Sequence, residues 1–174
     1  MNKGPLQTFN GVCLAFDVGL ASIGTALFIK RKLVLSWLQE SNPTKARGPD
    51  AWKHAARTYQ DYGLCPDSIV IETMKIYKPQ DIRKVIDARD ILELQGIAGA
   101  LANQWPDSIA YGVEPGGWKG QIKKQTMTNL IRATVKAYDW DSKIVLPSAN
   151  ELAHNVYDAV GLGIWAHGLP FRAR

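Results

Sequence analysis

The run 13–28 constrains this chain most, because it places one carboxylate, Asp17, between two apolar stretches that a tight glycine-containing turn connects. Such a pattern predicts a buried pair of antiparallel strands. A carboxylate inside a buried hairpin costs free energy unless a cation or a hydrogen-bond network compensates its charge. Strand-forming sequence therefore does not explain Asp17, and we expect a compensating group beside it.

Two further acids lie in sequence typical of a protein core. The apolar run 68–72 ends in Glu72, and Asp158 interrupts the apolar helical run 156–165. If the strands that end at Asp17 and Glu72 are neighbours, about 4.8 Å apart, their carboxylates can share a cation. The last helix would then bring Asp158 across the same end of the sheet. The three acids together predict one metal site.

The metal that such a site would take follows from its donor atoms. Hard oxygen ligands without cysteine favour Mg²⁺ or Mn²⁺ over zinc. Three carboxylates in one place repel each other, which favours two ions about 3.5–4 Å apart. One Mg²⁺, for which Mn²⁺ can substitute, would activate a water as nucleophile, and the other would stabilise the leaving 3′ oxygen. Helical spacing puts Asn155 and His154 on the face of Asp158, so both are candidate site residues.

Hydrophobic periodicity and turn residues divide the chain into strands and helices. Their order predicts an α/β protein with a five-stranded mixed sheet: three antiparallel strands followed by two parallel ones, flanked by helices on both faces. We expect one domain over 12–168, a flexible N-terminal tail over 1–11 and a short C-terminal tail over 169–174. The expected strands are 12–18, 24–30, 32–38, 68–72 and 109–114, and the expected helices are 50–62, 81–104, 127–138 and a last helix opened by a capping box at 148–151.

The charge of the chain is moderately basic, with 21 Lys and Arg residues against 16 Asp and Glu residues. Positive charge is concentrated in 30–57 and in 119–136, and the second segment has no acid. A basic surface around an acidic site suits a metal-dependent enzyme that acts on a polyphosphate. Two cysteines are too few for a disulfide framework or a zinc site, and no apolar run approaches the roughly 20 residues of a membrane span. We therefore expect a cytoplasmic protein with reduced thiols and no membrane partner.

The order and spacing of these motifs resemble the RuvC-type Holliday junction resolvases of the RNase H-like superfamily, over about residues 12–167. The resemblance implies an RNase H-like fold and an Mg²⁺-dependent endonuclease that cuts four-way junctions and other branched DNA, leaving 5′-phosphate and 3′-hydroxyl ends. It also implies a homodimer through the helix 81–104. Four segments carry the resemblance: the Asp-x-Gly motif and following glycine in 17–24, the strand 69–72, the central helix 88–99 and the final helix 154–163.

Two positions depart from the pattern of that family. The residue three before Asp158 is Asn155, where the family has Asp or His, and His154 lies one residue away. Either side chain could be the fourth ligand or could orient the water. The family also places an aromatic residue three positions after the glutamate, at the junction centre. Here that position is Lys75 and the nearest aromatic residue is Tyr77, for which we predict a stacking role.

The segment 115–124 is similar to the Trp-Lys-Gly…Lys segment of compact, phage-type members of the family. Its glycines permit a close approach of the backbone, and its lysines would face phosphates. A phage-encoded protein of this kind would work in the cytoplasm of the bacterial host. The residues expected to contact DNA are Lys75, Tyr77, Lys78, Trp118, Lys119, Lys123 and Lys124.

Three other classes of function compete with this interpretation. A different RNase H-like nuclease, such as a YqgF-type RNA-processing protein or a flap or fork nuclease, would share the topology, although the two-sided helix 81–104 and the Trp118 loop argue against the YqgF type. A non-catalytic DNA-binding module is disfavoured because all three acids are present. Sugar kinases and actin-like ATPases share an Asp-x-Gly motif but need two such domains, and 174 residues leave no room for these.

Overall fold

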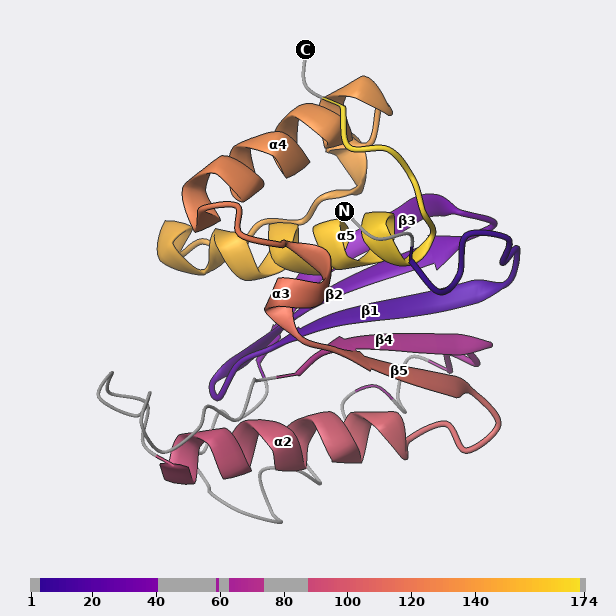
Figure 1. Cartoon of the computed structure of the whole chain (residues 1–174), viewed down its shortest axis with the longest axis vertical. Coiled ribbons are helices and arrows are strands. Elements are labelled where there is room, and N and C mark those ends of the chain that lie inside the picture. Colours follow the sequence, from indigo (N-terminus) through magenta and orange to yellow (C-terminus); the bar gives the residue numbers. More distant parts are fainter. Residues whose placement is uncertain (1–3, 41–58, 60–62, 74–87, 173–174) are drawn as a thin grey trace.

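The computed structural model describes residues 4–40, 59, 63–73 and 88–172, and these form a five-stranded sheet with helices on both faces (Figure 1). The strand order is β3-β2-β1-β4-β5. β2 is antiparallel to both β1 and β3, whereas β4 is parallel to both β1 and β5. The predicted mixed sheet is therefore confirmed. Its strands are β1 (Val12–Val18), β2 (Ser22–Ile29), β3 (Lys32–Glu40), β4 (Ser68–Glu72) and β5 (Ile109–Val113).

The helices lie in layers on the two faces of the sheet (Figure 1). α5 (Ala153–Ala166) packs on one face with α4 (Lys124–Ala137) outside it, and α2 (Ala88–Ala102) covers the opposite face. The short helix α3 (Pro115–Trp118) follows β5, and two 3-10 turns, η2 (Asp141–Lys143) and η3 (Asn150–Leu152), precede α5. Among the described helices, none has the length and apolar character needed to cross a membrane.

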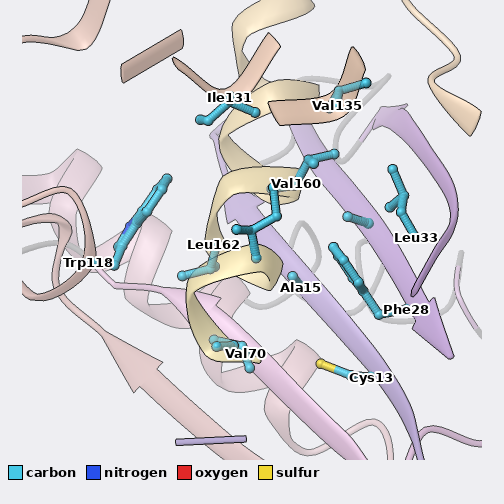
Figure 2. Packing of buried hydrophobic residues seen from close by; sticks show 14 of the residues in the cluster. Cys13, Ala15, Phe28, Leu33, Val70, Trp118, Ile131, Val135, Val160 and Leu162 are labelled. Atoms are coloured by element: carbon cyan, nitrogen blue, oxygen red, sulfur yellow. The ribbon is translucent and has the colours of Figure 1, made fainter. Parts of the chain in front are cut away.

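The two faces of β1 enter separate hydrophobic cores, because successive residues of a strand point to opposite sides. Cys13 and Ala15 pack in the core beneath α4 and α5, whereas Leu14 and Phe16 pack in the core beneath α2. Burial on both faces explains why the strand is a continuous apolar run. Figure 2 shows the first core, in which Val160 and Leu162 of α5 lie over Ala15, Phe28 and Val70 of the sheet and under Ile131 and Val135 of α4.

Two glycines allow α5 to lie close against the sheet. A Cβ on Gly24 of β2 would overlap the backbone of Asn155, and a Cβ on Gly163 of α5 would overlap the ring of Phe28. Gly24 is also the partner of Asp17 in the antiparallel pairing of β1 with β2. The glycine after the Asp-x-Gly motif thus lets the first turns of α5 approach the strand end that carries Asp17.

Several element boundaries differ from those expected. β2 begins at Ser22 and not at residue 24, β3 extends to Glu40, and α4 begins at Lys124. The predicted capping box at 148–151 is wrong, because η3 occupies its end and α5 starts one turn later with Leu152 as N-cap and no side-chain cap bond. The helix 50–62 lies outside the described residues except for the buried Tyr59, as do positions 81–87 of the helix 81–104.

The described parts of the terminal segments 1–11 and 169–174, which the sequence predicts as tails, make contacts with the rest of the domain. Leu6 is only 4% exposed, and its backbone nitrogen donates to the Ala166 carbonyl over 2.7 Å. At the other end, the Arg172 nitrogen donates to the Thr134 hydroxyl over 2.9 Å, and its guanidinium lies over the Tyr138 ring. These contacts tie each terminal segment to α5 or α4.

Candidate active site

Asp17 and Glu72 lie side by side at one end of the sheet, because they are partners in the parallel pairing of β1 with β4. Asp17 lies two residues after Ala15 and Glu72 lies two residues after Val70. The side chains of Ala15 and Val70 both pack beneath α5. The two-residue period of a strand therefore directs both carboxylates to the α5 side of the sheet. The strands that end at Asp17 and Glu72 are therefore neighbours, which is the condition under which the sequence predicts that their carboxylates can share a cation.

Asp158 completes the group from the second turn of α5, where it is 3% exposed. The three acids share a cavity of about 330 Å³ that opens at the carboxyl end of β1 and β4. The other residues that line this cavity are Val18, Gly19, Pro115, Lys119, Gly120, Ile122, Lys124, His154 and Asn155.

An ammonium group lies between two of the three carboxylates. Lys119 Nζ is 2.9 Å from Asp158 Oδ2, and 3.3 Å and 3.1 Å from Glu72 Oε1 and Oε2. The Lys119 side chain is 15% exposed, against 12% for Glu72 and 5% for Asp158. Burial alone would lower the pKa of Lys119, but the charges of Glu72 and Asp158 outweigh it and raise the pKa. Lys119 therefore stays positively charged at neutral pH.

Trp118 fixes the orientation of the glutamate. Its indole nitrogen donates a hydrogen bond of 2.6 Å to Glu72 Oε2, and its ring is fully buried beside α5 (Figure 2). The Lys119 ammonium also lies 4.6 Å from the centre of the Trp118 ring. In this conformation the buried ring has no face exposed for stacking on DNA, and the structure places the Trp118 side chain against Glu72.

Asp17 is the carboxylate whose charge is least compensated. Burial raises the pKa of Asp17 well above its ordinary value of 3.8, and the nearby charges of Glu72 and Asp158 raise it further. The positive charges of Lys119 and Lys124 act in the opposite direction but are outweighed. A cation bound beside Asp17 would relieve this repulsion and hold the carboxylate in its ionised form.

The donor set fits a divalent metal ion in its chemistry, since carboxylate oxygens of three residues face one cavity and a charge there lacks compensation. As the side chains stand, however, no group of three or more Asp, Glu, His or Cys residues in the described ranges is arranged to hold an ion. The Lys119 ammonium contacts two of the three acids instead.

His154 and Asn155 both line the cavity, so the choice between them as a fourth site residue stays open. The Nδ1 atom of His154 lies 2.6 Å from the Glu151 carbonyl, which occupies one side of its ring. The Asn155 amide donates to the Ser22 hydroxyl over 3.3 Å, which leaves its carbonyl oxygen as the atom available to a ligand or a water.

The predicted DNA-binding residues other than Trp118 fall into three groups. Lys123 and Lys124 are exposed at the start of α4, and Lys124 reaches the rim of the cavity. Lys119 is paired with Glu72 and Asp158, so its ammonium does not face a phosphate in this conformation. Lys75, Tyr77 and Lys78 lie outside the described residues.

Comparisons with known proteins place this geometry in a known fold. No family model and no curated protein matches the sequence. Among solved structures, RuvC of Thermus thermophilus in complex with a Holliday junction substrate superposes with a TM-score of 0.62 at 12% identity, covering 88% of this chain and 90% of that chain. This chain has the same fold as RuvC.

Two further structures with that fold come from distant sources. The yeast mitochondrial Holliday junction resolvase Ydc2 has a TM-score of 0.59 at 12% identity, with 96% of this chain and 79% of that chain covered. The fowlpox virus resolvase with its Holliday junction DNA has a TM-score of 0.51 at 13% identity, with 85% and 93% covered. At such identities the likeness concerns the resolvase fold, and the activity must be argued from the site.

Proposed function

We propose that this chain is a metal-dependent, structure-selective endodeoxyribonuclease that resolves Holliday junctions and related branched DNA. The observation that carries the proposal is the convergence of Asp17, Glu72 and Asp158 on one cavity of a resolvase fold. Buried acids at that position cost stability, which disfavours a non-catalytic binding module. Solved proteins with this fold include resolvases bound to Holliday junction DNA.

In this proposal, Asp17, Glu72 and Asp158 hold Mg²⁺, or Mn²⁺ in its place, with Asn155 or His154 as the fourth residue. Two bound ions would supply an activated water and stabilise the leaving 3′ oxygen, so the products carry 5′-phosphate and 3′-hydroxyl ends. In this proposal, Trp118 holds Oε2 of Glu72 and so restricts the orientation of the carboxylate toward the metal. His154 or Asn155 would orient the water from the rim.

Binding of DNA would come mainly from positive side chains around the cavity. Lys123 and Lys124 are exposed next to it, and the exposed Arg132 follows them in α4. Contacts between such side chains and phosphates supply most of the affinity for DNA without reading its sequence. Together with Lys75, Tyr77 and Lys78, these residues would hold the branch point over the acids.

A homodimer through the helix 81–104 would allow two symmetric nicks in one junction. Support comes from the outer side of α2, where Leu92 is 69% exposed and a Cβ on Gly99 would meet no atom within 4 Å. The exposed apolar residue offers a contact for a second helix. The glycine two turns away leaves room for the backbone of that helix to approach. Sedimentation of the purified protein tests this part of the proposal.

The substrate class is tested by cleavage of matched DNAs that differ only in their branching. A labelled four-way junction, a replication fork, a flap, a linear duplex and an RNA hairpin are incubated with Mg²⁺ or with EDTA. We expect paired nicks near the branch point of the junction with Mg²⁺ and no cleavage of the linear duplex. Preference for the flap or for the RNA would favour another RNase H-like nuclease, and binding without cleavage would favour a non-catalytic module.

A further inference from the structure

The position of Lys119 between two acids has a consequence for how the site takes up metal. Its ammonium contacts Glu72 and Asp158 at 2.9–3.3 Å, distances at which a charge-assisted hydrogen bond is strong. The same carboxylate oxygens are those that a divalent ion would need. The position between Glu72 and Asp158 can therefore hold either the Lys119 ammonium or a divalent ion.

We propose that the ammonium of Lys119 is the resident cation of this centre, and that a divalent ion must displace it from Glu72 and Asp158 to bind there. The inference rests on the proposed metal-dependent function and concerns how the same site is held without metal. In the metal-free protein, Lys119 keeps Glu72 and Asp158 together and compensates part of their repulsion.

The charges of the centre agree with this role. Three carboxylates and one ammonium leave a net charge of two negative units, which one divalent ion balances. Among the described residues, no salt bridge reaches Asp17, whereas Glu72 and Asp158 both pair with Lys119. The first ion would therefore bind beside Asp17, and the place between the other two acids becomes available only when Lys119 leaves it.

The structure around Lys119 also offers a second position for the displaced ammonium. Lys119 is the C-cap of α3 and is followed by Gly120, whose φ of +62° is a conformation that favours glycine. Its side chain and Gly120 line the open cavity in which a DNA phosphate would lie. A swing of the long side chain toward that opening would turn the internal ion pair into a phosphate contact, which is the role that the sequence predicted for Lys119.

The test measures Mn²⁺ binding without DNA, by electron paramagnetic resonance of the free ion, on the full chain. Lys119→Met removes the ammonium, and Lys136→Met removes one positive charge from the far part of α4 as a matched control. We expect Lys119→Met to bind Mn²⁺ at least about tenfold more tightly than wild type, because no opposing charge remains in contact with the acids. Lys136→Met should bind as wild type does.

A second measurement uses the wild-type protein alone and so does not depend on the folding of a variant. Lysines are acetylated with a limiting reagent, with and without saturating Mg²⁺, and the modified sites are mapped by mass spectrometry. We expect Mg²⁺ to raise the modification of Lys119 several-fold and to leave that of Lys136 unchanged, since adjacent carboxylates favour the protonated form of the amine, which does not react.

The outcomes separate this inference from the proposed function. If wild type binds Mn²⁺ and Lys119→Met binds it equally or more weakly, or if Mg²⁺ does not expose Lys119, the inference is overturned and the metal site stands. If neither protein binds Mn²⁺ in the millimolar range, the metal-dependent function fails, and the inference fails with it.

Discussion

The indole nitrogen of Trp118 lies 2.6 Å from Oε2 of Glu72, so a buried aromatic residue of α3 holds a carboxylate at the end of β4. Forty-six positions separate these two residues in the sequence. The hydrogen bond takes one lone-pair direction of the carboxylate and so restricts how Glu72 can face the cavity. The contribution of this hydrogen bond to cleavage and stability can be measured separately from the packing of the Trp118 ring.

Trp118→Phe should lower the rate of junction cleavage by about tenfold and weaken Mg²⁺ binding, because Glu72 loses the donor that orients it. The free energy of unfolding should fall by about 1.5–3 kcal/mol, typical of a hydrogen bond to a charged group. The matched control is Trp105→Phe, which loses an indole bond to the Leu64 carbonyl far from the acids. An equal loss of cleavage in both variants would show that Trp118 acts only through stability.

Asp17→Asn should abolish cleavage, retain junction binding and stabilise the metal-free protein. The folded-state pKa of Asp17 lies above 3.8, so the stability that this group supplies is present below pH 3.8 and is lost as the pH rises through the raised value. At pH 7 the neutral amide avoids that loss, and we expect a gain of at least about 1 kcal/mol in urea unfolding with EDTA. The exposed Asp107→Asn serves as control, and a destabilised Asp17→Asn variant would contradict the account.

Changing Lys123 and Lys124 together to Ala should weaken binding of a four-way junction and reduce the slope of log affinity against log salt by about 1 to 2. Both lysines are exposed beside the cavity, where phosphates of the substrate would lie. The double variant of Lys136 and Lys143, which removes the same charge elsewhere, should change the slope less. An unchanged slope in the first variant would place these lysines away from the DNA.

A buried histidine should make a contribution to stability that is lost as the pH drops from 6.5 toward 4, opposite in sign to that of Asp17. His167 is 0% exposed and packs against Phe9 and Phe28, and its burial lowers the pKa from 6.5 to about 4. Between these values the unfolded chain takes up a proton that the folded protein does not, so stability is lost as the pH falls, by up to about 2–3 kcal/mol. Urea unfolding from pH 7 to pH 4 should show this dependence, and it should diminish in His167→Phe but not in His154→Gln.

The main features of the fold and the acidic group follow from local sequence patterns. An apolar run that ends in an acid predicts both a buried strand and the position of a carboxylate, and this held for Asp17 and Glu72 with the expected parallel neighbours. The two-residue period then determines that both acids face the same helix layer. Asp158 is predictable for the same reason, since an acid within an apolar helix needs a partner.

The surroundings of the acids could not be predicted in the same way. α3 is a single turn of four residues, too short for any periodicity, so Trp118 and Lys119 looked like an exposed basic loop. Their contacts with Glu72 depend on how α3 returns over the sheet after β5, which no local pattern encodes. The local signal was the adjacency of a large aromatic residue and a lysine between glycines, which predicts a DNA-contacting segment. The capping box failed because a 3-10 turn took the place of the expected first turn of α5.

The central claim, that three converging carboxylates form the catalytic centre, is tested most directly by single-turnover cleavage of a four-way junction by Glu72→Gln. The glutamine keeps the length of the side chain but removes the charge that would hold a metal ion. We predict wild-type affinity for the junction, within about threefold, and a loss of Mg²⁺-dependent nicking of at least about a thousandfold. Nicking by Glu72→Gln at a rate near that of wild type would contradict the account.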